Sequence, residues 1–226
     1  MNYFVKNNLN LYKMDCMELM KKYPDNYFDL AIVDPPYGGG GDEKIEGGKR
    51  FGVLFDKYKV ARDGGTWSKK YDKKILNWDY APDQTYFDEL FRVSKNQIIW
   101  GGNYFQLPPN RCFLIWRKLT ISESFSMAMC EYAWCSFNSN AKWIELAPQD
   151  NNRFHPTQKP VKLYSWILQN YAKAGDKILD THLGSGSIAI ACHDMNFNLT
   201  GCEIDEDYFI KMCERINIHT AQLQLF

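Results

Sequence analysis

The sequence predicts a protein of the α/β class, with a largely parallel sheet covered by helices on both faces. Three observations lead to this prediction. Short apolar segments typical of buried strands alternate along the chain with segments whose apolar residues recur at helical spacing. The chain has 226 residues, of which 45% are hydrophobic and 15% aromatic, and this is enough to bury a core. Its apolar runs are far shorter than the roughly 20 residues that span a bilayer, so neither a membrane segment nor a signal peptide is expected.

Charge and cysteine content exclude further classes. The 27 basic and 27 acidic residues give a net charge of zero, which argues against a protein held to nucleic acid by overall basicity but leaves room for a local patch. The seven cysteines are an odd number and contain no C-x-x-C pair. We interpret them as reduced packing residues of a cytoplasmic protein, and we expect no metal site.

The first elements are a strand over residues 9–14, a helix that Asp15 opens as its N-cap, and a buried strand over residues 28–33. This second strand must end at Asp34-Pro35-Pro36-Tyr37, because two prolines cannot continue a central strand. A carboxylate, a rigid backbone and an aromatic ring therefore follow the strand directly.

Residues 39–80 differ in character from the rest of the chain. Glycines fill positions 38 to 41, and residues 42–74 hold ten basic against six acidic residues, a net charge of +4, with aromatic residues between them. We expect a long functional loop or small lobe inserted into the sheet domain. We interpret residues 1–226 as a single domain that carries this insert.

Regular elements resume after this insert. A helix over 82–94 is followed by a strand over 97–100, the turn 101–103, and strands over 112–116 and 131–137. Beyond the polar stretch 138–152 we expect a helix from about residue 160 to 172, a strand over 177–180, a helix over 187–195, a strand over 198–203 and a helix from Asp205 to about residue 216. From Gly175 onward eight acidic residues oppose three basic ones, a net charge of −5, so the neutral total conceals an uneven distribution.

The turn after residues 177–180 is the first candidate site. Gly184 and Gly186 let a ligand approach the backbone, and Glu203, 17 residues after Gly186, ends the next strand, where a carboxylate can accept both hydroxyls of a ribose. Dehydrogenases and S-adenosylmethionine binders both use such a unit. The third glycine of G-x-G-x-x-G is missing, which disfavours a pyrophosphate-bearing cofactor. The alternative is a plain tight turn with Glu203 as a solvated strand end.

Asp34-Pro35-Pro36-Tyr37 is the second candidate site. A strand in an open α/β sheet points such a carboxylate at the carboxyl edge, where ligands bind. Asp34 and the Pro35 carbonyl could accept the two N–H groups of an exocyclic amine while Tyr37 stacks on the base. The alternative is an Asp-Pro turn with a packed tyrosine.

Together these motifs resemble the amino-methyltransferases of DNA, which methylate adenine at N6 or cytosine at N4 from S-adenosylmethionine. The order of the motifs resembles the β group, and the resemblance spans most of the chain apart from residues 39–80 and 138–154. It implies a Rossmann-like S-adenosylmethionine-dependent methyltransferase sheet. It also implies a catalytic role for Asp34, Pro35, Pro36 and Tyr37.

The resemblance also implies a set of cofactor residues. The segment from Asp180 to Gly186 is similar to the family's D-x-x-F-x-G-x-G loop, although His182 stands where Phe is usual and Thr181 where Pro is usual. Residues 155–160 resemble an H-x-T-x-K-P segment beside the cofactor's methionine end, and Asp15 resembles the residue that meets its adenine; a plain helix N-cap explains Asp15 equally well. The implied cofactor residues are Asp15, Lys159, Asp180, His182, Gly184, Ser185, Gly186 and Glu203.

The resemblance predicts methylation of the N6 amine of a flipped adenine in double-stranded DNA, since Asp34 favours adenine over cytosine. Alternatives are an N4-cytosine enzyme, an RNA or free-nucleoside methyltransferase, a nicotinamide-dependent oxidoreductase, which would leave residues 34–37 unexplained, and a non-catalytic nucleotide-binding module. The basic insert is the candidate DNA-contacting lobe, and 138–154 a possible recognition segment. A homodimer is expected by resemblance alone, and a restriction partner is left open.

Overall fold

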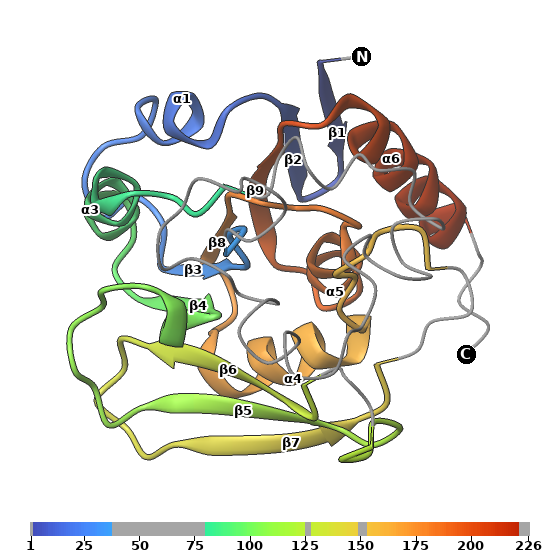
Figure 1. Ribbon diagram of the computed structural model, residues 1–226. Helices are drawn as coiled ribbons and strands as arrows, with labels where there is room; N and C mark the ends of the chain where they lie inside the picture. Colours follow the sequence, from blue (N-terminus) through green and yellow to red (C-terminus); the bar gives the residue numbers. More distant parts are fainter. Residues whose placement is uncertain (1, 38–79, 125–127, 149–152, 222–226) are drawn as a thin grey trace.

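The computed structural model describes residues 2–37, 80–124, 128–148 and 153–221. Within these residues a nine-stranded sheet is covered by helices on both faces (Figure 1), which confirms the predicted α/β class. The strands are β1 (Tyr3–Lys6), β2 (Leu9–Lys13), β3 (Leu30–Val33), β4 (Gln97–Trp100), β5 (Phe113–Lys118), β6 (Cys130–Cys135), β7 (Lys142–Leu146), β8 (Lys177–Asp180) and β9 (Asn198–Glu203). The helices are α1 (Cys16–Met20), α3 (Gln84–Val93), the 3-10 turn η2 (Gly102–Tyr104), α4 (Val161–Tyr171), α5 (Ser187–Asp194) and α6 (Glu206–Ala221).

The strand order is β1-β2-β9-β8-β3-β4-β6-β5-β7. The five strands from β2 to β4 in this order are parallel, so their carboxyl ends share one edge of the sheet. The sheet is thus largely parallel, as predicted, and its antiparallel pairs are β1 with β2 and β6 with both β4 and β5.

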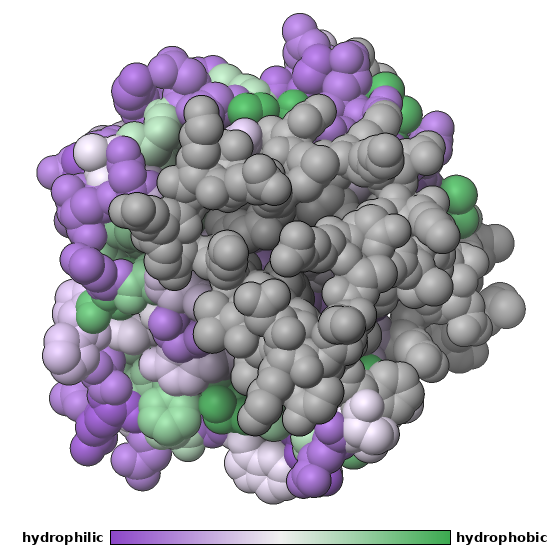
Figure 2. All heavy atoms as spheres, viewed as in Figure 1, coloured by the Kyte–Doolittle hydropathy of each residue, from purple (hydrophilic) through white to green (hydrophobic). Residues whose placement is uncertain are grey.

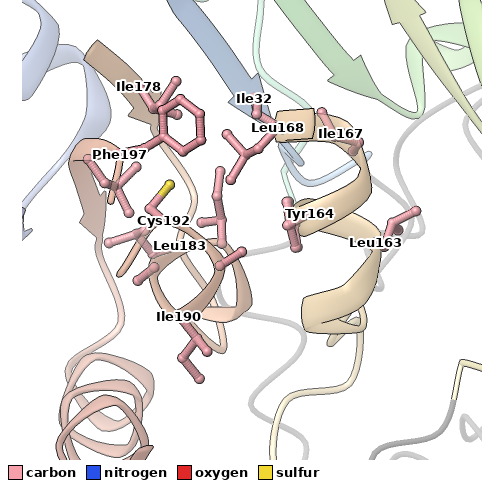
Figure 3. Packing of buried hydrophobic residues seen from close by; sticks show 14 of the residues in the cluster. Ile32, Leu163, Tyr164, Ile167, Leu168, Ile178, Leu183, Ile190, Cys192 and Phe197 are labelled. Carbon is pink, nitrogen blue, oxygen red and sulfur yellow. The ribbon is translucent and has the colours of Figure 1, made fainter. Parts of the chain in front are cut away.

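Two apolar layers hold the helices to the sheet. On β3 the side chains alternate: Leu30 and Ile32 join the core under α4, α5 and α6, whereas Ala31 and Val33 join the core under α1 and α3. Figure 3 shows the first core, with Tyr164 and Leu168 among the α4 side chains that lie toward α5. Burial on both faces explains why the central strands are continuous apolar runs.

The exposed residues of α1 and α3 are polar. In Figure 2 hydrophilic residues cover most of the visible described surface on the side of α1 and α3. On α3 the buried positions are Tyr86, Phe87, Leu90 and Val93, which recur at helical spacing, and Asp83 caps the helix with its carboxylate. None of the described helices has the length and apolar character needed to cross a membrane.

The predicted elements are confirmed within a few residues, and the differences lie at the sheet edges. Two edge strands, β1 and β7, were not predicted, and β7 lies inside the stretch 138–152 that was interpreted as polar loop. Helix α6 continues to Ala221, five residues beyond the predicted end at 216. All seven cysteines are free, and five of them are buried, in agreement with a packing role. The predicted insert, apart from Tyr80, lies outside the described residues.

Candidate active site

The carboxyl edge of the parallel strands brings the two predicted sites together. Asp15 follows β2, Glu203 ends β9, Asp180 ends β8, Asp34 follows β3 and Gly101 follows β4, in the spatial order of the strands. Strands β8 and β3 are neighbours, but the chain continues from β8 through α5 to β9 on one side and from β3 toward α3 and β4 on the other. Ligands of open α/β sheets bind at such a point of divergence.

The glycine turn between β8 and α5 has the backbone that its sequence predicts. Gly184 and Gly186 have φ angles of +51° and +71°, in the left-handed region that favours glycine. A Cβ on Gly186 would lie 2.4 Å from Cγ of Met212, and one on Gly184 would lie 3.3 Å from the ring of His155. The positive φ thus favours glycine at both positions, and at Gly186 a side chain would also displace Met212. Between them, Ser185 is buried, and its carbonyl accepts a hydrogen bond of 2.9 Å from Arg215.

Glu203 is not a solvated strand end. Only 9% of it is exposed. Its Oε2 accepts the Gly184 N–H at 2.8 Å and its Oε1 accepts the Asp205 N–H at 2.9 Å. Burial raises the pKa of this carboxyl, and the backbone donors oppose the rise. Each oxygen keeps a second lone pair, so the side chain supports the turn and can still accept hydrogen bonds from a ligand.

Asp180 and His182 are both kept from charge by burial. Burial raises the pKa of Asp180 to about 8, and the charges of Asp34 and Glu203 add to this rise. The hydrogen bond that Oδ1 accepts from the His182 N–H, at 2.9 Å, acts in the opposite direction and lowers the pKa. Burial lowers the pKa of His182 to about 4, and the charge of Asp15 opposes that change. Near neutral pH the turn therefore carries little charge of its own in the free protein.

Asp15 caps α1, as one of the two interpretations of this residue predicts. Its Oδ1 accepts the N–H groups of Met17 at 2.8 Å and Glu18 at 3.2 Å, and its side chain is exposed at the same sheet edge. The capping role is complete as it stands. A cofactor contact at Asp15 stays a prediction.

His155 packs beside the glycine turn. Its ring meets Tyr208 of α6 edge-on, with centroids 4.3 Å apart, and touches the position where Gly184 lacks a side chain. Burial, together with the charges of Arg153 and Lys159, lowers the pKa of His155 to about 3, so the ring is neutral. The segment 155–160 thus joins the turn to the start of α4.

Tyr37 and Asp34 are held in a fixed arrangement after β3. The Tyr37 hydroxyl donates to Oδ1 of Asp34 at 2.6 Å. The Tyr37 ring lies against Gly101, where a Cβ would come within 2.2 Å of Cε1, and it stacks with Tyr104 at 5.2 Å and 24°. Pro35 is buried and Pro36 half-buried. This close approach of ring to backbone explains Gly101, whose φ is +67°.

Lys159 lies at the second candidate site, beside Asp34. Its ammonium pairs with Oδ2 of Asp34, and Oε2 of Glu131 lies 3.2 Å from the same Nζ. Burial lowers the pKa of Lys159, but the carboxylates of Asp34 and Glu131 outweigh burial and raise it. Glu131 also contacts Lys118, with Nζ 2.7 Å from Oε1.

Sequence reasoning missed Glu131 and Lys118. Burial raises the pKa of Glu131, but the two lysines outweigh it and hold the pKa at about 2. The available signal was a single acid in the otherwise apolar and aromatic strand Cys130–Cys135. A lone carboxyl on a half-buried strand needs a partner, and Lys118, at the end of β5, has 9% of its side chain exposed.

A family model named N6_N4_Mtase and described as a DNA methylase matches residues 92–213, which is more than half of the chain. The chain belongs to this DNA methylase family. The match includes Lys159, the glycine turn and Glu203, and begins after Asp34. Membership confirms the predicted class of DNA amino-methyltransferase and its cofactor, S-adenosylmethionine, and it agrees with a nucleoside-binding unit at the carboxyl edge.

Relatives and solved structures agree with this assignment. The type II methyltransferase M.HpaI of Haemophilus parainfluenzae is 25% identical over 90% of this chain and 72% of its own length. M2.MboI of Moraxella bovis, also a type II methyltransferase, is 24% identical over 92% and 87%.

Three crystal structures share the fold of this DNA methylase. The cytosine-N4-specific PvuII DNA methyltransferase has a TM-score of 0.60 at 10% identity, covering 100% of this chain and 92% of its own. The M1.HpyAVI–SAM complex has a TM-score of 0.53 at 20% identity, covering 92% and 99%. A putative DNA modification methylase of Thermus thermophilus, complexed with S-adenosyl-L-methionine, has a TM-score of 0.53 at 15% identity, covering 94% and 95%.

Proposed function

We propose that this DNA methylase transfers a methyl group from S-adenosylmethionine to the N6 amine of an adenine in DNA, with Asp34 and the Pro35 carbonyl as the acceptors of the amine. The observation that carries the proposal is the adjacency of β3 and β8. It brings the Asp34 carboxylate and the glycine turn to neighbouring strand ends on one sheet edge. A nucleoside cofactor at the turn and an amine at Asp34 would thus meet there.

The exocyclic amine of adenine is a poor nucleophile because its lone pair is delocalised into the ring. Acceptors on both N–H groups favour a pyramidal nitrogen whose lone pair can attack a methyl group. They also stabilise the positive charge that develops on nitrogen. Asp34 is well placed for this, because its hydrogen bond with Tyr37 and its ion pair with Lys159 fix the carboxylate.

The residues at the turn fit S-adenosylmethionine. The two glycines leave no side chain over the backbone, and Glu203 can accept from the ribose hydroxyls. When bound, the cofactor supplies an electrophilic sulfonium methyl group. Asp180, largely uncharged in the free protein near neutral pH, would ionise more readily beside that cation. The other members of the proposed cofactor set are Asp15, His182, Ser185 and Lys159. In the free protein the Lys159 ammonium pairs with Asp34.

The target base would join an existing aromatic group. Tyr37 stacks with Tyr104, and Phe105 meets Tyr37 edge-on at 6.1 Å. A base inside a duplex cannot reach Asp34, so it must leave the helix at a cost of a few kcal/mol, and stacking recovers roughly 1–3 kcal/mol. A flipped nucleotide of double-stranded DNA is therefore the proposed substrate.

Four further parts of the proposal concern DNA and partners. The basic segment 42–74 contacts the phosphate backbone, and residues 138–154, which contain β7, contribute to target recognition. The chain acts as a homodimer. The relatives named as type II methyltransferases support a place in a restriction-modification system.

A second candidate is methylation of cytosine at N4. The PvuII enzyme, named as cytosine-N4-specific, shares the fold over the whole of this chain. Asp34 favours adenine, because the family's cytosine enzymes more often begin the corresponding motif with Ser.

One assay distinguishes the candidates. The protein is incubated with duplex DNA and S-adenosylmethionine labelled in its methyl group, and the DNA is then digested to nucleosides. We expect the label in N6-methyldeoxyadenosine. Label in N4-methyldeoxycytidine would show that the target base is cytosine and not adenine. The absence of any labelled nucleoside would contradict the proposed activity.

A further inference from the structure

Four charged side chains form a continuous chain that ends at Asp34. Lys118 contacts Oε1 of Glu131 at 2.7 Å, Oε2 of Glu131 lies 3.2 Å from Nζ of Lys159, and Lys159 contacts Oδ2 of Asp34. The exposed fractions of these side chains are 9% for Lys118, 26% for Glu131, 3% for Lys159 and 14% for Asp34. Little solvent therefore reaches the Lys159 ammonium, and its charge depends on the two carboxylates.

Both oxygens of Asp34 are engaged in the free protein. Oδ1 accepts from the Tyr37 hydroxyl and Oδ2 holds Lys159. A target amine that donates an N–H to Asp34 therefore arrives at a carboxylate that already has partners. Glu131 gives the ammonium an alternative partner that it can reach without leaving the site.

We propose that Glu131 is a positioning residue that takes over the Lys159 ammonium when the target amine engages Asp34. No proton moves and no bond forms in this step, because the ammonium only changes the carboxylate that it favours. Lys118 holds the other oxygen of Glu131, so Glu131 stays in place during the exchange. The catalytic part of this inference rests on the proposed function, whereas the sharing of one ammonium by two carboxylates does not.

The aromatic residues around the four charged side chains suit an ammonium that moves a short distance. The Nζ of Lys159 lies 5.2 Å from the ring centroid of Trp100, and the Nζ of Lys118 lies 5.4 Å from that of Trp116. The two rings meet edge-on at 6.4 Å. Aromatic rings attract a cation without competing for its hydrogen bonds, so the ammonium stays bound at either carboxylate.

Thermal unfolding of the free protein tests the sharing of the ammonium without any substrate. Asp34→Asn and Glu131→Gln each leave Lys159 with one carboxylate, and we expect each to lower Tm by about 3–5 °C. The double variant leaves a buried ammonium without a carboxylate, and its Tm should fall by at least about 5 °C more than the sum. Additive losses would overturn the inference.

Two further variants keep this test decisive. Glu145→Gln is the matched control, because Glu145 pairs with the exposed Arg117 on the neighbouring strands β5 and β7, and its effect should add to that of Asp34→Asn. If the Asp34→Asn, Glu131→Gln protein does not fold, adding Lys159→Met removes the orphaned cation and should restore folding. Failure of this rescue would count against the sharing of Lys159.

Kinetics test the catalytic part of the inference. Glu131→Gln should lower kcat at least tenfold and leave the KM for S-adenosylmethionine unchanged, and Glu131→Asp, which keeps the charge, should recover part of the loss. An unchanged kcat in Glu131→Gln would refute the positioning role. A wild-type protein that methylates no DNA would instead refute the proposed function, while the unfolding cycle would still decide whether the ammonium is shared.

Discussion

The ends of β3 and β8 carry two aspartates on neighbouring strands in opposite electrostatic settings. Asp34 has a buried ammonium on one oxygen and a tyrosine hydroxyl on the other. Asp180 accepts only the His182 N–H among the described hydrogen bonds, and burial raises its pKa to about 8. One strand end thus offers a paired carboxylate and the other a largely neutral carboxyl. The strands place both aspartates at one sheet edge, but Asp34 meets an ammonium from a distant segment, whereas burial dominates at Asp180.

This difference suits the two proposed tasks. The Asp34 carboxylate, which its partners hold in place in the free protein, can accept an N–H group from a neutral amine. A carboxyl that is neutral in the free protein can ionise when a cation binds, so its charge follows cofactor binding.

Removal of the shared ammonium should have the largest effect. Lys159→Met leaves Asp34 and Glu131 without the cation between them, and breaking a buried ion pair from one side costs roughly 3–5 kcal/mol. Urea unfolding measures this loss. Lys142→Met, at an exposed lysine that bonds Asn170, is the control and should change stability by less than about 0.5 kcal/mol. Equal effects of the two variants would show that the cluster does not stabilise the fold.

Asp180→Asn should change how stability depends on pH. The folded protein holds a proton on Asp180 up to about pH 8, whereas the unfolded chain loses it near the ordinary value of 3.8, so this group makes stability fall as pH rises between these values. Asn cannot ionise and still accepts from the His182 N–H. At about 1.36 kcal/mol per pH unit up to about pH 8, we therefore expect the variant to gain roughly 4 kcal/mol over the wild type between about pH 5 and pH 8.5.

Urea unfolding of the free protein at both pH values measures this gain. His155 and His182, whose pKa values burial lowers to about 3 and about 4, act in the opposite direction below pH 6.5, but they are common to both proteins and cancel in the difference. Asp176→Asn, just before β8, is the control, because its carboxylate accepts the exposed Lys173 N–H. A difference curve for Asp180→Asn that is flat with pH would be inconsistent with a raised pKa at this carboxyl.

Glu203→Gln should have a smaller effect, confined to the cofactor. Gln offers one acceptor oxygen where Glu203 uses two for the N–H groups of Gly184 and Asp205. We expect S-adenosylmethionine to bind about tenfold more weakly, or roughly 1.4 kcal/mol, with kcat little changed at saturation. Calorimetric titration measures the affinity, with Glu206→Gln, an exposed partner of Lys13, as the control. Unaltered affinity would remove Glu203 from the proposed cofactor set.

Local sequence signals predicted the parts of the fold that depend on local physics. Strand β4 has the predicted bounds, and Asp15 and Asp83 cap helices because their carboxylates reach backbone N–H groups two or three residues ahead. The positive φ of Gly184 and Gly186 follows from the same kind of signal. The strands β1 and β7 escaped prediction because they lie at the ends of the described sheet and few of their residues are buried.

The partners within the site could not be predicted in this way. The predicted residues Asp34 and Asp180 do lie at adjacent strand ends, because parallel strands share a carboxyl edge. That Lys159 pairs with Asp34 and also meets Glu131 depends on where α4 and the antiparallel β6 pack. Lys159 and Asp34 are 125 residues apart, and contacts over such a distance produce no periodic pattern in the sequence.

The most direct test compares Asp34→Asn with Asp180→Asn in single-turnover methyl transfer to DNA, with cofactor affinity measured on the same samples. The account predicts that Asp34→Asn binds S-adenosylmethionine within about threefold of the wild type but transfers the methyl group at least 100-fold more slowly. Asp180→Asn should bind the cofactor more weakly and transfer at a near-normal rate once saturated. Transfer at the wild-type rate by Asp34→Asn would contradict the account.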